Sequence, residues 1–280
     1  MGRRTAIVGA RCTVVLLAVA LGACSGSSSP SPASTTAAAS GQPTRTGKVL
    51  RETDVNGNYR QGIARSGSGW IFTTNNAIYR TDRGFVELEA KRLAIPPSLS
   101  RQGYDHLGDP DVHDGMIWVP VERDDKTQAR QVTARYDEDT LKYVDSFAVP
   151  QHHNSFVAVD RKGVVYSTDQ FTDDTIRRYR RKGRRLVPIE PLVMDQTIAK
   201  IQGGDVANGA LWISTDDALN GLYRVDLDTG EVQIITSSGH VEGEGEGIDA
   251  TPLRGALLHA LVADERIAPM WVVDVAVRRT

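Results

Sequence analysis

Histidine and acidic residues recur along the chain at positions that could assemble into one polar site. His106 and His153 are 47 residues apart, and Glu244 occupies a comparable position later in the chain. Imidazole nitrogens and carboxylate oxygens together suit a divalent cation, and a neutral imidazole can also act as a general base. The full set of candidate ligand-binding residues is His106, Asp109, His152, His153, Asp205, Glu244 and Glu246.

A divalent cation at this site would have His106, His153 and Glu244 as its ligands. Carboxylate oxygens favour calcium whereas imidazole nitrogens favour zinc, so both metals stay open. The alternative is that these side chains form a solvated acidic rim or hydrogen-bond to loop backbone. No catalytic residue is assigned, because the sequence has no Gly-x-Ser-x-Gly elbow, Walker loop or His-Glu-x-x-His motif.

Both cysteines, Cys12 and Cys24, lie near the amino terminus. The rest of the sequence therefore offers no disulfide, thiolate metal site or cysteine nucleophile. Residues 1–23 combine a basic start, about ten apolar residues and a small-residue end, which is typical of a secretory signal peptide. The apolar run is too short to cross a bilayer core of roughly 30 Å.

The segment Leu21-Gly22-Ala23-Cys24 resembles the lipobox of bacterial lipoproteins. This resemblance implies cleavage before Cys24 and diacylation of its thiol, which would anchor the protein on the extracytoplasmic face of the cell membrane. Residues 24–46 are dominated by Ser, Thr, Ala, Pro and Gly, so we predict a disordered linker. The predicted domains are a signal peptide at 1–23, a lipidated linker at 24–46 and a folded domain at 47–280.

The folded domain contains a repeat that begins with glycine, two apolar residues and usually an aromatic residue. Asp114-Gly115 and Asn208-Gly209 are typical of tight hairpin turns, because glycine accepts positive φ. Short segments with many β-branched residues and frequent alternation follow each glycine, which indicates β-strands. The repeat glycines, spaced by 46, 48, 46 and 46 residues, are Gly69, Gly115, Gly163, Gly209 and Gly255.

Four short strands in a unit of this length are what a β-propeller blade requires. We predict an all-β propeller of five four-stranded blades, with six left open. The fifth unit lacks an outer strand, and residues 48–55 would supply it and close the ring, which removes an unpaired sheet edge. The predicted inner strands are 61–65, 109–112, 155–159, 203–206 and 247–250.

This blade pattern is similar to that of bacterial extracytoplasmic β-propellers, including the gluconolactonase-like and glutamine-cyclotransferase-like families. The similarity covers residues 47–280 at the level of blade architecture. It implies the fold, and no activity is carried over, because one fold hosts many functions. Propeller enzymes often hold a central cation that would polarise a substrate oxygen.

In a blade, the loop entering the inner strand and the loop between the second and third strands share one face. We name this the mouth face and expect the candidate site there. The strand at 48–55 would start on the opposite face, from which the lipid tether would then leave. Residues Arg177–Arg185, with seven basic residues in nine, would form a turn on that same opposite face. This turn is either a solvated hairpin that protects a blade edge or a contact with anionic lipid or a cell-wall polymer.

The leading functional hypothesis is a secreted, membrane-anchored protein of the cell envelope whose mouth binds a small ligand or an envelope protein. One alternative is a cation-dependent hydrolase or lactonase with His106 or His153 as general base. Another alternative is a protein-interaction scaffold. The net charge of −2 at pH 7 argues against nucleic-acid binding, and we expect a monomer.

Overall fold

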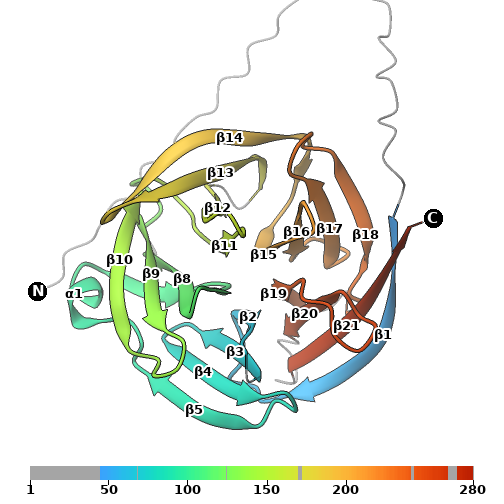
Figure 1. Ribbon diagram of the computed structural model, residues 1–280, viewed down its shortest axis with the longest axis horizontal. Helices are drawn as coiled ribbons and strands as arrows, with labels where there is room; N and C mark the ends of the chain where they lie inside the picture. Colours follow the sequence, from blue (N-terminus) through green and yellow to red (C-terminus); the bar gives the residue numbers. More distant parts are fainter. Residues whose placement is uncertain are drawn as a thin grey trace, which may run out of the picture. The chain divides into compact units, whose positions relative to one another are not determined.

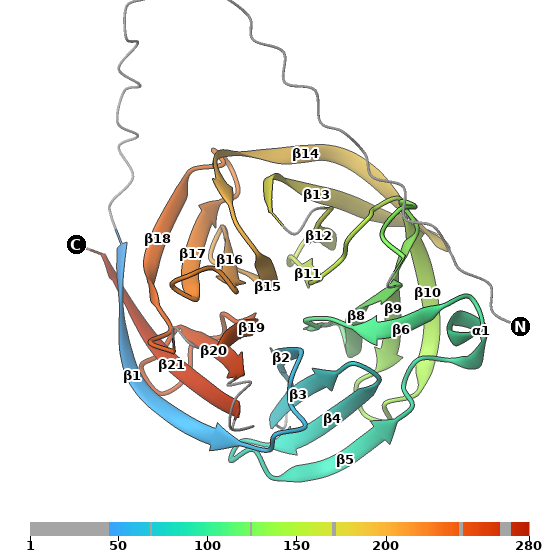
Figure 2. The same ribbon diagram turned by 180° about the vertical axis from the view of Figure 1, so that it is seen from behind.

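The computed structural model describes residues 45–67, 69–123, 125–169, 172–240, 243–263 and 270–279. These residues form five antiparallel sheets arranged as blades around an axis, a five-bladed β-propeller (Figures 1 and 2). The predicted fold class is confirmed. The predicted signal peptide, the predicted lipidation site Cys24 and nearly all of the predicted linker lie outside the described residues.

Each blade is a series of neighbouring strands that extends from the axis outward. Blade 1 contains β2 (Gly62–Arg65), β3 (Gly69–Thr74), β4 (Ala77–Asp82) and β5 (Glu87–Arg92). Blade 2 contains β6 (Tyr104–Leu107) and β7 (Asp111–His113) on the inside, then β8 (Met116–Arg123), β9 (Gln131–Asp137) and β10 (Tyr143–Val149). Blade 3 contains β11 (Ala158–Val159), β12 (Val164–Thr168), β13 (Asp173–Lys182) and β14 (Arg185–Ile198).

Blade 4 contains β15 (Ile201–Ala207), β16 (Ala210–Thr215), β17 (Gly221–Asp226) and β18 (Val232–Ser237). Blade 5 contains β19 (Glu244–Asp249), β20 (Leu258–Ala263), β21 (Met270–Arg279) and β1 (Arg45–Val55). A short helix, α1 (Pro97–Ser100), lies between blades 1 and 2 in the chain. No helix in the described part of the chain has the length and apolarity needed to cross a membrane.

Blade 5 takes its outer strand from the start of the described chain, as expected. β1 runs antiparallel to β21 along its whole length, which closes the ring (Figure 1). At this seam Arg51 on β1 forms an ion pair with Asp274 on β21 at 2.6 Å. Asp274 also lies 2.7 Å from the buried His259 on β20, so this one carboxylate links the side chains of β1, β20 and β21.

Gly115 and Gly209 occupy the tight turns predicted for them. Asp114 and Gly115 have φ angles of 51° and 70°, and Asn208 and Gly209 have φ angles of 53° and 74°. Positive φ at both central residues is the geometry of a two-residue hairpin turn that fits the twist of the paired strands. In blades 2 and 4 these turns therefore fix where the inner strand ends and the second strand begins.

The hydrophobic core is divided among the five interfaces between neighbouring blades. On β3, Trp70 and Phe72 pack with Leu261 of blade 5, whereas Ile71 packs with Leu107 of blade 2. Successive side chains of a strand point to opposite faces of its sheet, so each blade buries both faces. This double burial explains why the inner half of each blade reads as an apolar run.

Candidate ligand-binding site at the mouth face

Asp109 lies at the axis of the ring, where the inner strands meet. Its Oδ1 accepts the N–H of Ile63 in blade 1 at 2.9 Å. Its Oδ2 accepts the N–H groups of Gly204 in blade 4 and Ile248 in blade 5 at 3.0 and 3.3 Å. Its own N–H donates to the carbonyl of Ser155 in blade 3 at 2.8 Å. One residue of blade 2 therefore bonds to all four other blades.

The Asp109 carboxylate is fully buried, and glycines of the inner strands make room for it. A Cβ atom added at Gly62, Gly203 or Gly247 would lie within 2.7 Å of an Asp109 atom. Burial raises the pKa of Asp109 well above its ordinary value, and the three N–H donors oppose that rise. Because its oxygens are engaged by backbone, we assign Asp109 a structural role at the axis.

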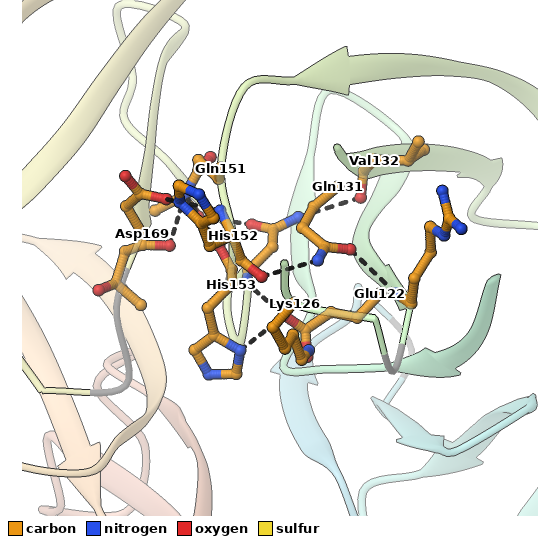
Figure 3. A network of polar contacts seen from close by, with 12 residues as sticks. Glu122, Lys126, Gln131, Val132, Gln151, His152, His153 and Asp169 are labelled. Atoms are coloured by element: carbon orange, nitrogen blue, oxygen red, sulfur yellow. Dashed lines mark hydrogen bonds and ion pairs between the residues drawn. The ribbon is translucent and has the colours of Figure 1, made fainter. Parts of the chain in front are cut away.

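On the mouth face, the predicted histidine His153 contacts Glu122, a carboxylate that was not among the residues expected from the sequence (Figure 3). Glu122 lies near the end of β8, opposite His106 on β6 in the strand register. Its Oε1 is 2.8 Å from Nδ1 of His153 and also accepts the backbone N–H of Asn154. Its Oε2 is 2.8 Å from Nζ of Lys126. Both oxygens of this buried carboxylate thus have positively charged or N–H partners.

The surroundings of Glu122 and His106, which are opposite each other in the strand register, set the charge of both side chains. Burial alone would raise the pKa of Glu122, but the hydrogen bond and charge of His153 and the charge of Lys126 lower it to about 2. Burial lowers the pKa of His106, and the nearby Glu122 carboxylate opposes this effect. At neutral pH the site therefore holds a neutral imidazole beside an ionised carboxylate.

His106 and Glu122 line a cavity of about 350 Å³ on the mouth face. Within the described part of the chain, the His106 imidazole has no hydrogen bond or ion pair, so it is available to a ligand. A cavity with a neutral acceptor, carboxylates and cations can bind hydroxyl and carboxylate groups of a small molecule. The complete lining is Asn75, Asp105, His106, Glu122, Arg123 and Lys126.

The other candidate residues lie apart from this cavity. His152 approaches Asp169 at 3.4 Å, in the neighbouring part of blade 3 (Figure 3). Glu244 begins β19 and is half-buried, and Glu246 is buried two residues later on the same strand. Asp205 lines a different cavity, on the opposite face.

The described residues include no ready-made metal site. Among the residues that the structure describes, no three His, Cys, Asp or Glu side chains form a group that could hold a metal ion. His106 and His153 share Glu122 as a neighbour, whereas Glu244 belongs to blade 5. A calcium or zinc ion held by His106, His153 and Glu244 therefore stays a prediction.

A larger cavity of about 860 Å³ opens on the opposite face, which we name the tether face because β1 begins there. Three carboxylates of inner strands line this cavity, the buried Asp249 and the half-buried Asp111 and Asp205, and desolvation raises the pKa of each, to about 7 for Asp111. Each of them accepts a backbone N–H from the next blade, which binds the inner strands together. The pairs are Asp111 with Val159, Asp205 with Ala250, and Asp249 with Arg65.

Solved structures similar to this chain are also β-propellers, whereas comparisons of its sequence found no match. No model of a known protein family matches the chain, and no curated protein matches it. Similar solved structures include the PQQ-bound aldose sugar dehydrogenase of Streptomyces coelicolor, at 14% identity and a TM-score of 0.51, covering 85% of this chain and 100% of that chain.

Two further similar structures are a calcium-binding protein, regucalcin, of Agrobacterium tumefaciens and a putative gluconolactonase. The first has 13% identity and a TM-score of 0.50, and covers 78% of this chain and 76% of that one. The second has 14% identity and a TM-score of 0.51, and covers 75% of this chain and 71% of that one. At such identities the likeness shows the fold alone, and at that level it supports the resemblance to gluconolactonase-like propellers.

Proposed function

We propose that the protein is a lipid-anchored propeller on the extracytoplasmic face of the membrane that binds a small polar ligand in the mouth cavity. The observation that carries this proposal is the neutral, unpaired imidazole of His106 beside the ionised Glu122. Arg123 and Lys126 add positive charge to the same cavity. A polyhydroxylated acid matches this lining, because its hydroxyls can donate to His106 and its carboxylate can bind the cations.

Binding is tested by calorimetric titration of the protein with gluconate. We expect that His106→Ala weakens the affinity at least tenfold, because the ligand loses a buried hydrogen-bond partner. His113→Ala is the matched control, because His113 belongs to the same blade but lines the cavity on the tether face. Equal affinities in the two variants would contradict the proposed site.

The anchor is supported by the lipobox-like segment that ends at Cys24. The position of β1 is consistent with an anchor, because Arg45, where a tether would join, and the mouth cavity lie on opposite faces of the propeller. Replacing Cys24 by Ser should prevent acylation and move the protein from the membrane fraction to the soluble fraction of the envelope or the medium. A variant that stays in the membrane fraction would show that Cys24 is not the anchor.

A second candidate function is a lactonase-type hydrolase at the same cavity. It is favoured by His106, since burial keeps this imidazole neutral and able to accept a proton from water at neutral pH. The water would attack the lactone carbonyl while His106 takes its proton, the acyl C–O bond of the ring would break, and the ring oxygen would take the proton back from His106 to become a hydroxyl. The carboxylate formed would lie near Arg123 and Lys126. Hydrolysis of glucono-1,5-lactone above the spontaneous rate, lost in His106→Gln, would support it. The assay is repeated with added calcium or zinc, because one similar structure is named as calcium-binding.

A further inference from the structure

Positive charge on the tether face is concentrated on blade 3. The turn between β11 and β12 carries two exposed basic residues. The hairpin of β13 and β14 carries seven, and five remain when Arg177, which pairs with Asp169, and Arg181, which lies over the Phe147 ring, are set aside. We name these seven side chains the basic blade surface. They are Arg161, Lys162, Arg178, Arg180, Lys182, Arg184 and Arg185.

The basic blade surface lacks neutralising partners. None of its seven side chains forms an ion pair with another described residue, whereas Arg177 on the same strand pairs with Asp169 at 3.0 Å. Two carboxylates lie within the same part of blade 3, Asp160 and Glu190. Asp160 is engaged by backbone N–H groups of its own turn and by the hydroxyl of Tyr166. Six of the seven basic side chains are exposed, and the half-buried Arg178 donates to the Glu190 carbonyl, so a surplus of positive charge remains at the surface.

The neighbouring blades do not extend this surface. The corresponding hairpin of blade 2 carries Glu138 and Asp139, and that of blade 4 carries Asp226 and Asp228. Glu138 is engaged by the hydroxyl of Ser66 at 2.7 Å. A partner attracted by positive charge would thus approach blade 3 and avoid its neighbours.

The strand register places this surface on the face where the amino-terminal chain joins the propeller. In blade 3, Lys182 pairs with Arg185 at the turn that lies beyond the end of the inner strand. In blade 5, Arg45 pairs with Arg279 beyond the end of β19. The 44 residues before Arg45 include the proposed lipid anchor, so the chain that carries this anchor joins the propeller on this face.

We propose that the basic blade surface docks the propeller on an anionic phospholipid membrane. Lys and Arg close to an anionic bilayer each favour binding roughly fivefold, and the effect falls off within a Debye length of about 10 Å. Docking through one blade tilts the ring and leaves the mouth cavity open to the surroundings. The proposal rests on the location in the proposed function, but the contact itself needs no acyl chain.

The test uses the chain from Ser25 onward, because the ring closes within residues 45–279 and the apolar segment that would itself bind lipid is then absent. Binding is measured by co-sedimentation with phosphatidylcholine vesicles and with vesicles in which half of the lipid is phosphatidylglycerol. We expect binding to the anionic vesicles alone, with loss of binding in concentrated salt.

The decisive variant reverses three charges of the hairpin, Lys182→Glu, Arg184→Glu and Arg185→Glu. We expect it to weaken vesicle binding about a hundredfold, given the per-residue effect of anionic lipid. The matched control has the same composition and charge change outside the basic blade surface, and carries Lys91→Glu, Arg101→Glu and Arg130→Glu. The control should weaken binding only severalfold, through the net charge.

Equal binding to the two kinds of vesicle, or equal loss in the two variants, would overturn the proposal. Binding to soluble polyphosphate without binding to the anionic vesicles would assign the surface to a polymer and overturn it as well. If the triple variant does not fold, Arg161→Gln with Lys162→Gln in the other turn must reduce vesicle binding instead. Gluconate affinity should be the same in all of these variants, so a failure of the membrane contact is distinct from a failure of the mouth site.

Discussion

Asp109 and Glu122 are both buried acidic residues of blade 2, but their partners differ in kind. Asp109 accepts backbone N–H groups from three other blades, which cannot move without opening the ring. Glu122 is held mainly by the side chains of His153 and Lys126, beside a cavity. The comparison shows that a buried carboxylate is available for ligand chemistry when movable side chains surround it, and is structural when the backbone of several elements surrounds it.

Removing the Asp109 carboxylate should have the largest effect. In Asp109→Ala three buried N–H groups lose their acceptor, and each unsatisfied group costs about 1–3 kcal/mol. We expect the free energy of unfolding, measured in urea, to fall by at least about 3 kcal/mol, or the variant not to fold. Asp105→Ala, at an exposed position of the same blade, is the control. A stability equal to that of the control would show that Asp109 does not hold the ring.

The space around the axial carboxylate can be tested without removing it. In Gly247→Ala the new Cβ would lie 2.2 Å from Oδ1 of Asp109, so the inner strand must shift. We expect a loss of about 1–3 kcal/mol in the free energy of unfolding. Gly67→Ala is the matched control, because its new Cβ would have its nearest neighbour 4.0 Å away. If Gly247→Ala and Gly67→Ala lower the free energy of unfolding by the same amount, the space around Asp109 is not restricted by Gly247.

Glu122→Gln should have a smaller effect on stability and a distinct effect on its pH dependence. The pKa of Glu122 is lowered to about 2 from 4.5, so its stabilising effect is complete above pH 4.5 and is lost as the pH falls towards 2. We expect Glu122→Gln to cost about 1–3 kcal/mol at pH 7 and to lose less additional stability between pH 4.5 and 2 than the parent. Urea unfolding at several pH values measures this, and parallel curves for the two proteins would contradict the assignment.

The fold was predictable because its signals are local. Each blade has its own turn glycine and β-branched strands, and residues 48–55 had no other strand to pair with. The inner strand of blade 2 was less predictable: residues 109–112 were expected, but the strand is split into β6 and β7. Asp109 forms a bridge with Phe156 of blade 3 instead, and Pro110 has no N–H to donate.

The candidate site was predicted only in part, because its contacts join residues distant in sequence. His106 and His153 recur at nearly the same position in successive blades, whereas Glu122 is the last but one residue of the mainly apolar strand β8 and does not lie in a loop. An acidic residue at the end of such a strand was the available signal. The structural role of Asp109 depends on partners 46, 95 and 139 residues away, which no local pattern reveals. The glycines at its contact positions were the one trace in the sequence.

The central claim is that ligand binds at the mouth cavity and not among the structural carboxylates of the tether face. The most direct measurement is NMR chemical-shift mapping of backbone amides during titration with gluconate. The mouth assignment predicts that shifts concentrate at Asp105, His106, Glu122 and Lys126 and are negligible at Asp111, Asp205 and Asp249. Shifts that concentrate instead at these three aspartates would place the ligand in the tether-face cavity and contradict the claim.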